Sequence, residues 1–189
     1  MKVYILGAEI EKYDTLTFDD ANSSVAIVNK LRRRPTSALE NWKPLKIKDA
    51  IIRGEKSVFH PELLLPVISE SAARIIKDTC LNYVELLPLE HEVDEYWMLN
   101  FPVLLDCIDG VGSDFSTYSD GGVNEYKKIA FKYNVINKSS ATIFRASFHD
   151  MPNVSTGQTF VTDIFKNKVE EYGLKGFHFF EVGDSDQGE

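Results

Sequence analysis

The side chains that most often perform chemistry are scattered through this sequence. No two of its four histidines have the spacing of zinc ligands. Neither cysteine has a histidine or a second cysteine close by. Cys80 ends a helical pattern, and Cys107 lies within the apolar run VLLDCI. We therefore expect both to be buried, unpaired thiols in a reducing compartment, and we expect no metal site.

One string of carboxylates, DCIDGVGSD, has the composition of a cation-binding loop. It contains Asp106, Asp109 and Asp114, but it lacks the alternating spacing and the distant glutamate of a calcium loop. The glycines in and after this string are followed by no GKS or GKT sequence and no third glycine, so we interpret them as turn glycines rather than as a phosphate cradle. No serine stands in a G-x-S-x-G pattern. The sequence therefore predicts no catalytic residues, no cofactor and a protein that is not an enzyme.

Charge is distributed unevenly along the 189 residues, whose formal net charge is −8. Residues 1–77 have an excess of three positive charges, and residues 127–189 are balanced. Residues 78–126 contain eleven acidic side chains and no lysine or arginine. Such a segment repels phosphate backbones and attracts basic surfaces, so it argues against nucleic-acid binding and favours a basic protein partner. The alternative is a solvated acidic face that only maintains solubility.

The acidic segment supplies the candidate contacts with a partner. These residues are Glu90, Glu92, Asp94, Glu95, Asp106, Asp109, Asp114 and Asp120. The basic run Arg32–Arg34 has no interleaved aromatic side chains, so it is a weak nucleic-acid signal. The apolar runs are too short to cross a bilayer, and the opening MKVYILG is too short for a secretory signal. We therefore expect a cytoplasmic protein without membrane contact.

Local patterns predict three parts of the chain. Residues 1–56 form an irregular N-terminal part that packs on the main domain, with a strand at 2–6, a second strand at 25–31, and then loops and short strands. Residues 57–182 form the main domain. Residues 183–189 form a polar, acidic and frayed tail.

Two amphipathic helices are expected in the main domain, at residues 70–80 and 163–172. Each segment has apolar side chains at helical spacing. Ser69 and Thr162 are placed to cap the N-termini of these helices, and Gly173 is suited to end the second helix.

Strands account for most of the remaining main domain. Apolar alternation predicts a strand at 128–136, and a turn at 137–140 would return the chain as a strand at 141–148. Further strands are expected at 84–89, 96–100, 103–108 and 177–182, and loops at 109–124 and 149–159. The predicted fold class is α+β, a mixed, mostly antiparallel sheet packed by the two amphipathic helices.

Two segments of the chain are similar to each other. A shift of 93 positions lays VISESAARIIKDTCLNYVELL over FVTDIFKNKVEEYGLKGFHFF without a gap. In both copies a hydroxyl N-cap and an acidic first turn precede a helix, a tight turn and a strand. This similarity indicates either a duplicated unit or one packing solution used twice.

Five segments resemble, in order and spacing, the motifs of a known family. They are VFHPELLLPVISESAARIIKD, NYVELLPLE, YWMLNFPVLLDCID, ATIFRAS and FVTDIFKNKVEEYGLKGFHFFEV. The family that they resemble is immunity-protein family eleven of bacterial polymorphic toxin systems, formerly a domain of unknown function. The resemblance covers about residues 57 to 182. His60 departs from it, because the family pattern has an aspartate before the proline.

The resemblance implies a protein that binds one cognate toxin domain and blocks it, without catalytic residues or a cofactor. An acidic surface suits the basic cleft of a toxin, and such a contact would occlude the active site. A cytosolic inhibitor implies a toxin that acts in the cytosol, such as a nuclease or an NAD- or nucleotide-modifying enzyme. The alternatives are a housekeeping interaction or scaffold protein, and a small enzyme whose residues are too dispersed to form a motif. The sequence leaves the oligomeric state open.

Overall fold

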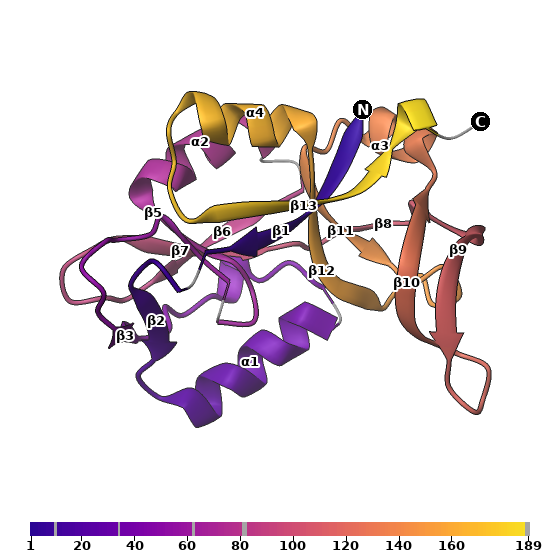
Figure 1. Cartoon of the computed structure of the whole chain (residues 1–189). Coiled ribbons are helices and arrows are strands. Elements are labelled where there is room, and N and C mark those ends of the chain that lie inside the picture. The colour runs from indigo at the N-terminus through magenta and orange to yellow at the C-terminus, as the bar shows by residue number, and fades with distance from the viewer. Residues whose placement is uncertain (10, 34, 62, 81–82, 188–189) are drawn as a thin grey trace.

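A computed structural model describes residues 1–9, 11–33, 35–61, 63–80 and 83–187, with only the backbone described at 78–80 and 187. The side chain of Cys80 therefore lies outside the described residues. Four α-helices and thirteen strands occur in the described part of the chain, and the strands form mostly antiparallel sheets (Figure 1). The predicted α+β class is confirmed.

The largest sheet has five strands in the order β13-β1-β12-β11-β8. All neighbouring strands in it are antiparallel except β11 and β8, which are parallel. The strands span β1 Lys2–Ala8, β8 Leu104–Leu105, β11 Ile143–Ser147, β12 Ser155–Thr162 and β13 Phe177–Asp184. The predicted strands at 2–6 and 177–182 are thus confirmed, and they are neighbours in this sheet.

Three smaller sheets complete the fold. One has four antiparallel strands in the order β4-β5-β7-β6, and the pairs β2–β3 and β9–β10 each form a two-stranded antiparallel sheet. Their bounds are β2 Thr15–Phe18, β3 Ile47–Ile51, β4 Phe59–His60, β5 Val67–Ser69, β6 Glu85–Leu89, β7 Tyr96–Asn100, β9 Ile108–Thr117 and β10 Val123–Phe131. The strands expected at 84–89 and 96–100 are therefore present as β6 and β7.

The two predicted amphipathic helices are confirmed as α2 (Glu70–Cys80) and α4 (Asp163–Glu171). Their apolar stripes enter one core cluster, in which Ile76 of α2 and Phe165 of α4 pack with Tyr4 of the central strand. Figure 1 shows the two helices side by side over the same layer of strands. Burial of these stripes against the sheets holds both helices in place.

Helix α4 ends as predicted at Gly173 but begins without the predicted side-chain cap. Gly173 has φ +60°, and the N–H groups of Gly173 and Leu174 donate to the carbonyl oxygens of Glu170 (3.1 Å) and Val169 (3.0 Å), which is the Schellman arrangement. The predicted hydroxyl cap at the N-terminus is wrong for Thr162, whose buried Oγ1 has no hydrogen-bond partner among the described residues. Asp163 accepts the backbone N–H of Ile164 at 3.0 Å instead.

The strand predicted at 25–31 is wrong, because these residues lie in helix α1 (Ala21–Arg33). Its buried residues, Ser24, Val28 and Leu31, have helical spacing. Asp20 caps the helix by accepting the backbone N–H of Asn22 at 3.2 Å. The run of valine and isoleucine favoured a strand, but the cap and the packing of one face decide for the helix.

The hairpin predicted at 128–148 is also wrong. The first strand ends at Phe131, and Tyr133–Ser139 forms helix α3, so the turn expected at 137–140 is replaced by a helix and its left-handed end at Ser140 (φ 56°). β10 pairs with β9, and β11 pairs with β12 and β8. The alternation continued past the strand because α3 also buries apolar side chains, notably Ile136, against the same core.

The loop expected at 109–124 is in fact most of the β9–β10 hairpin, and only residues 118–122 form its turn, closed by the Tyr118 N–H to Gly122 carbonyl bond of 2.8 Å. Gly110 is not a turn glycine. A Cβ atom there would lie 2.3 Å from the ring of His149, so the glycine permits close packing within a strand. The loop expected at 149–159 likewise ends early, because β12 begins at Ser155.

The two similar segments adopt the same topology. In the first, α2 connects β5 to β6, and β7 lies between those strands and is antiparallel to both. In the second, α4 connects β12 to β13, and β1 lies between them in the same antiparallel sense. Each unit is therefore a parallel strand pair with a helical crossover and one inserted strand, and the second unit takes its inserted strand from the start of the sequence.

The segment after residue 182 is folded as far as it is described. β13 continues to Asp184, and Ser185–Gln187 forms a 3-10 turn. The Ser185 N–H donates to the Met1 carbonyl at 3.0 Å. The predicted fraying is therefore wrong for residues 183–187, while Gly188 and Glu189 lie outside the described residues. The division of the chain into parts at residues 56 and 182 stays a prediction.

Candidate partner-binding surfaces

The eight acidic residues singled out in the sequence fall into two separate groups. Glu90, Glu92, Asp94 and Glu95 lie in the connection between β6 and β7, whereas Asp106, Asp109, Asp114 and Asp120 lie on or beside the β9–β10 hairpin. Figure 1 shows this connection and the hairpin at opposite ends of the molecule. The acidic segment is therefore continuous in sequence but does not form one surface.

Lysines from the N-terminal part of the chain pair with the first group. Lys46 Nζ lies 3.1 Å from Glu90 Oε1, and Lys56 Nζ lies 2.5 Å from Asp94 Oδ2. Hydrogen bonding to Asp94 raises the pKa of Lys56 above its ordinary value. A hollow of about 490 Å³ lies beside this group, with lysines and carboxylates in its lining. The surface is thus mixed in charge, although the sequence segment that contains the acids is not.

The second group is less neutralised. Asp106 pairs with Lys132 at 3.1 Å. Asp114 is exposed on β9, and Asp120 is exposed in the turn, where it accepts the Gly122 N–H at 3.0 Å. Asp109 accepts the Val111 N–H at 3.0 Å. Asp114 and Asp120 therefore make no ion pair among the described residues, although Lys128 of β10 is the register partner of Asp114.

The turn half of the hairpin is anchored by a small polar and aromatic cluster. Tyr126 Oη and His149 Nδ1 share a hydrogen bond of 2.8 Å, and the His149 ring packs 4.9 Å from that of Phe115. Burial raises the pKa of Tyr126. Asp150 accepts the Val123 N–H at 3.2 Å. These contacts hold the hairpin against the segment that follows β11.

A groove of about 740 Å³ separates the hairpin from the central sheet. Its lining comes from β1, β9, β10, β12 and the end of β13, with Tyr133 of α3. Burial, followed by the nearby Asp184, Asp186 and Glu181, raises the pKa of Tyr133. Of the eight acidic residues singled out in the sequence, Asp109 lines this groove, but the groove as a whole was not predicted, because its residues come from five strands far apart in the chain.

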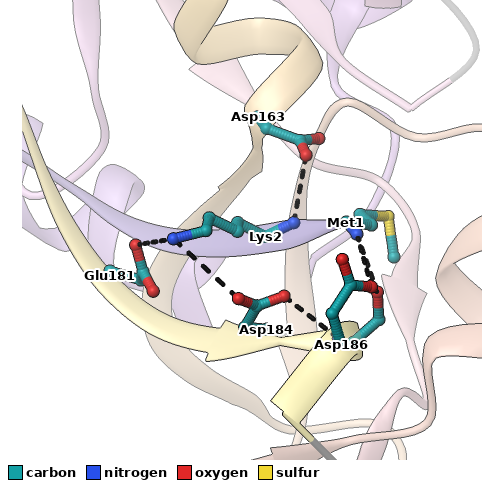
Figure 2. A network of polar contacts seen from close by, with 7 residues as sticks. Met1, Lys2, Asp163, Glu181, Asp184 and Asp186 are labelled. Carbon is teal, nitrogen blue, oxygen red and sulfur yellow. Dashed lines mark hydrogen bonds and ion pairs between the residues drawn. The ribbon is translucent and has the colours of Figure 1, made fainter.

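Two carboxylates of β13, those of Glu181 and Asp184, line one side of this groove, and Lys2 of β1 forms ion pairs with both. Figure 2 shows its ammonium between two carboxylates of β13, with Nζ 2.9 Å from Glu181 Oε2 and 3.9 Å from Asp184 Oδ2. Hydrogen bonding to Glu181 raises the pKa of Lys2. The backbone N–H of Lys2 donates to Asp163 Oδ2 at 3.1 Å, which joins β1 to the start of α4. These carboxylates are therefore already engaged within the molecule.

One buried cation makes no ion pair with a carboxylate among the described residues. Arg145, in the predicted motif ATIFRAS, is 2% exposed and donates to the carbonyl oxygens of Arg32 (3.1 Å) and Gly157 (2.8 Å). Burial, and then the charge of Arg32, lowers its pKa to about 10. Because a cation near a helix C-terminus is favourable, Arg145 fixes the end of α1 to the sheet. Of the basic run 32–34, Arg34 lies outside the described residues.

The described residues offer neither a reactive thiol nor a metal site. Cys107 is a buried free thiol whose pKa is raised by burial to about 12, so it is a poor nucleophile. Within the described ranges, no group of three or more His, Cys, Asp or Glu side chains is arranged to hold a metal ion. In that same part of the chain, no helix is long and apolar enough to cross a membrane.

The structure is therefore an α+β protein whose described surface has a groove beside the β9–β10 hairpin, a hollow beside the β6–β7 connection and exposed acidic side chains on both. Comparison with protein-family models matches residues 87–184 to the immunity protein family Imm11. Because the match covers just over half of the sequence, the chain belongs to this family, in agreement with the resemblance of its motifs. No curated protein matches the chain significantly.

Proposed function

We propose that this protein is an immunity protein that binds a cognate toxin domain of a bacterial polymorphic toxin system and neutralises it by occluding its active site. Membership of the immunity family Imm11 is the observation that carries the proposal. The protein acts as a non-enzymatic inhibitor in the cytoplasm and needs no cofactor. The buried, weakly acidic thiol of Cys107 is consistent with this role.

The partner in this proposal is a toxin that acts in the cytosol, a nuclease or another enzyme with a basic cleft for phosphate. Acidic residues of the chain face that cleft, because complementary charge accelerates association and selects the right partner. The candidate contacts are the two groups described above. We favour the hairpin group, because Asp114 and Asp120 have no ion pair among the described residues, whereas Glu90 and Asp94 are paired with lysines.

The deciding experiment uses the cognate toxin domain, which the proposal expects to be encoded beside this gene. Cells that express this domain alone should stop growing, and co-expression of the protein should restore growth. Purified protein should bind an inactivated form of the domain and block the activity of the intact form. Continued growth arrest together with no detectable binding would contradict the proposal and favour a housekeeping interaction protein.

The acidic contacts are tested by charge reversal in two matched variants. One changes Asp114 and Asp120 to Lys, and the other changes Glu92 and Glu95 to Lys. The hairpin variant should associate more slowly and lose the salt dependence of its association rate, while the second variant should behave like the parent. An unchanged association rate for both variants would show that these acids form only a solvated face.

A further inference from the structure

We propose that the groove between β10 and β13 and the aromatic pair beside it receive a protruding segment of the toxin that presents an apolar side chain next to a carboxylate. This inference rests on the proposed function, because it names the place and the chemistry of toxin binding. It is carried by an uncovered sheet face, by an exposed aromatic platform and by unpaired basic side chains along one wall.

The first observation is that the two faces of the central sheet are covered unequally. On one face, Tyr4 and Leu6 pack in the core under α2 and α4. On the other face, the hairpin and α3 cover only the part around Val3, Phe144 and Phe160. Of the neighbouring positions on this face, Gln158 of β12 is exposed, while Ile5 and Val182 are half-buried at the edge of that cluster.

The second observation is an aromatic platform on the open part. Ile5 and Phe180 are paired across β1 and β13, and so are Gly7 and His178, so all four project to the same side. The Phe180 ring lies over Gly7, where a Cβ atom would be 2.7 Å from it, and 4.2 Å from the His178 ring. Phe180 is nevertheless 54% exposed.

Such a platform suits a protein interface. The close contacts of the ring with Gly7 and His178 restrict its position, so a partner would bury its exposed side at a smaller cost in side-chain ordering. Exposed, well-positioned aromatic side chains are typical anchors of protein–protein binding. Ile5, the paired neighbour of Phe180, lines the groove, and therefore the platform and the groove form one continuous surface.

The third observation concerns charge. Lys127 and Lys128 line the β10 side of the groove, and both are exposed and make no ion pair among the described residues. On the β13 side, Glu181 and Asp184 are engaged by Lys2 (Figure 2). Lys127 and Lys128 thus keep their capacity for a carboxylate, even though Asp109 of β9 also lines the groove and the whole chain has a net charge of −8. A segment with an apolar residue beside an acidic one complements both features.

The test compares groove variants with controls against the inactivated cognate toxin domain. Phe180→Ser should weaken binding by about tenfold or more, as expected for an interface anchor. The double variant Lys127→Glu/Lys128→Glu should weaken binding mainly through a slower association rate. The first control is Tyr172→Ser, which changes an aromatic residue that is 64% exposed at the C-terminal end of α4. The second control is the double variant Lys138→Glu/Lys175→Glu, which changes two exposed lysines outside the groove. Both controls should bind like the parent.

Circular dichroism and urea unfolding of each variant separate lost binding from lost folding. If Phe180→Ser unfolds, Phe180→Leu supplies the same test with an apolar side chain, and hydrogen exchange of the parent complex supplies another. Toxin binding should protect amides at 126–131 and 180–184. Parental binding by the folded groove variants, with protection elsewhere, would overturn this inference alone. Failure of the parent to bind or protect would instead overturn the proposed function and this inference with it.

Discussion

The packing of Gly110 against His149 gives a quantitative prediction about the anchoring of the hairpin. In Gly110→Ala the new Cβ atom would lie 2.3 Å from Cδ2 of the His149 ring. The ring cannot move freely, because it is hydrogen bonded to Tyr126 (2.8 Å) and packs against Phe115. Overpacking of this kind costs about 1–3 kcal/mol. For a chain of this size, that lowers Tm by roughly 2–4 °C for each kcal/mol.

A double-mutant cycle isolates the clash. His149→Ala alone should cost about 1.5–2.5 kcal/mol, the sum of one hydrogen bond and an aromatic contact. Because that variant removes the obstructing ring, Gly110→Ala in the His149→Ala background should cost less than about 0.5 kcal/mol. The coupling free energy should therefore be about 1–3 kcal/mol.

Urea unfolding followed by circular dichroism measures all four proteins of the cycle. Gly122→Ala is the matched control, because it changes a glycine of the same hairpin where the new Cβ atom has only an ordinary contact, 3.4 Å from Asp120 Oδ1. Equal destabilisation by Gly110→Ala in both backgrounds would refute the clash with His149 as its cause.

Three further predictions concern burial and helix ends. Burial raises the pKa of Tyr96 to about 12. The buried neutral phenol therefore contributes to stability below about pH 10, and this contribution is lost as the pH rises toward 12. Urea unfolding at pH 8 and at pH 11 should show a smaller loss of stability between these pH values in Tyr96→Phe than in the parent. Cys107, buried and with a pKa of about 12, should react with a thiol reagent at pH 8 only on unfolding, and peptide mass spectrometry would disprove this by finding rapid labelling in native protein. Asp163→Ala should lower the unfolding free energy by about 1–2 kcal/mol, because it removes the acceptor for the Lys2 N–H and a negative charge at the start of α4, and Asp163→Asn should lower it less; equal stability of all three proteins in urea would contradict this.

The elements predicted correctly from the sequence are those with complete local signals. Helix α4 combines an acidic first turn, an apolar stripe and Gly173 at its end, and α2 has the same stripe and first turn. Helix α1 was missed because its two valines and one isoleucine favour strands, although the Asp20 cap marked its start. Alternation at 129–135 predicted one long strand, since strand β10 and helix α3 both supply apolar side chains to one core.

The candidate surfaces were harder to predict than the fold. The sequence locates the acids, but Lys46, Lys56 and Lys132 approach them only through pairing of distant segments. The groove was missed because it is assembled from five strands. The sequence FHFF at residues 177–180 contained one signal of the exposed aromatic pair. Phe177 and Phe179 lie on one face of β13 and pack against the core, so His178 and Phe180 must lie on the other face. Because β13 is an edge strand, that second face is only partly covered, and Phe180 is exposed.

The central position of β1 has a consequence for the synthesis of the protein. Its hydrogen-bonded neighbours, β12 and β13, are translated long after it, so this strand leaves the ribosome with Val3, Tyr4 and Leu6 exposed and without a sheet to join. Pairing so distant in sequence is slow to form. The central sheet therefore closes only after β13 has been made, and until then this apolar strand is a segment through which the nascent protein can aggregate.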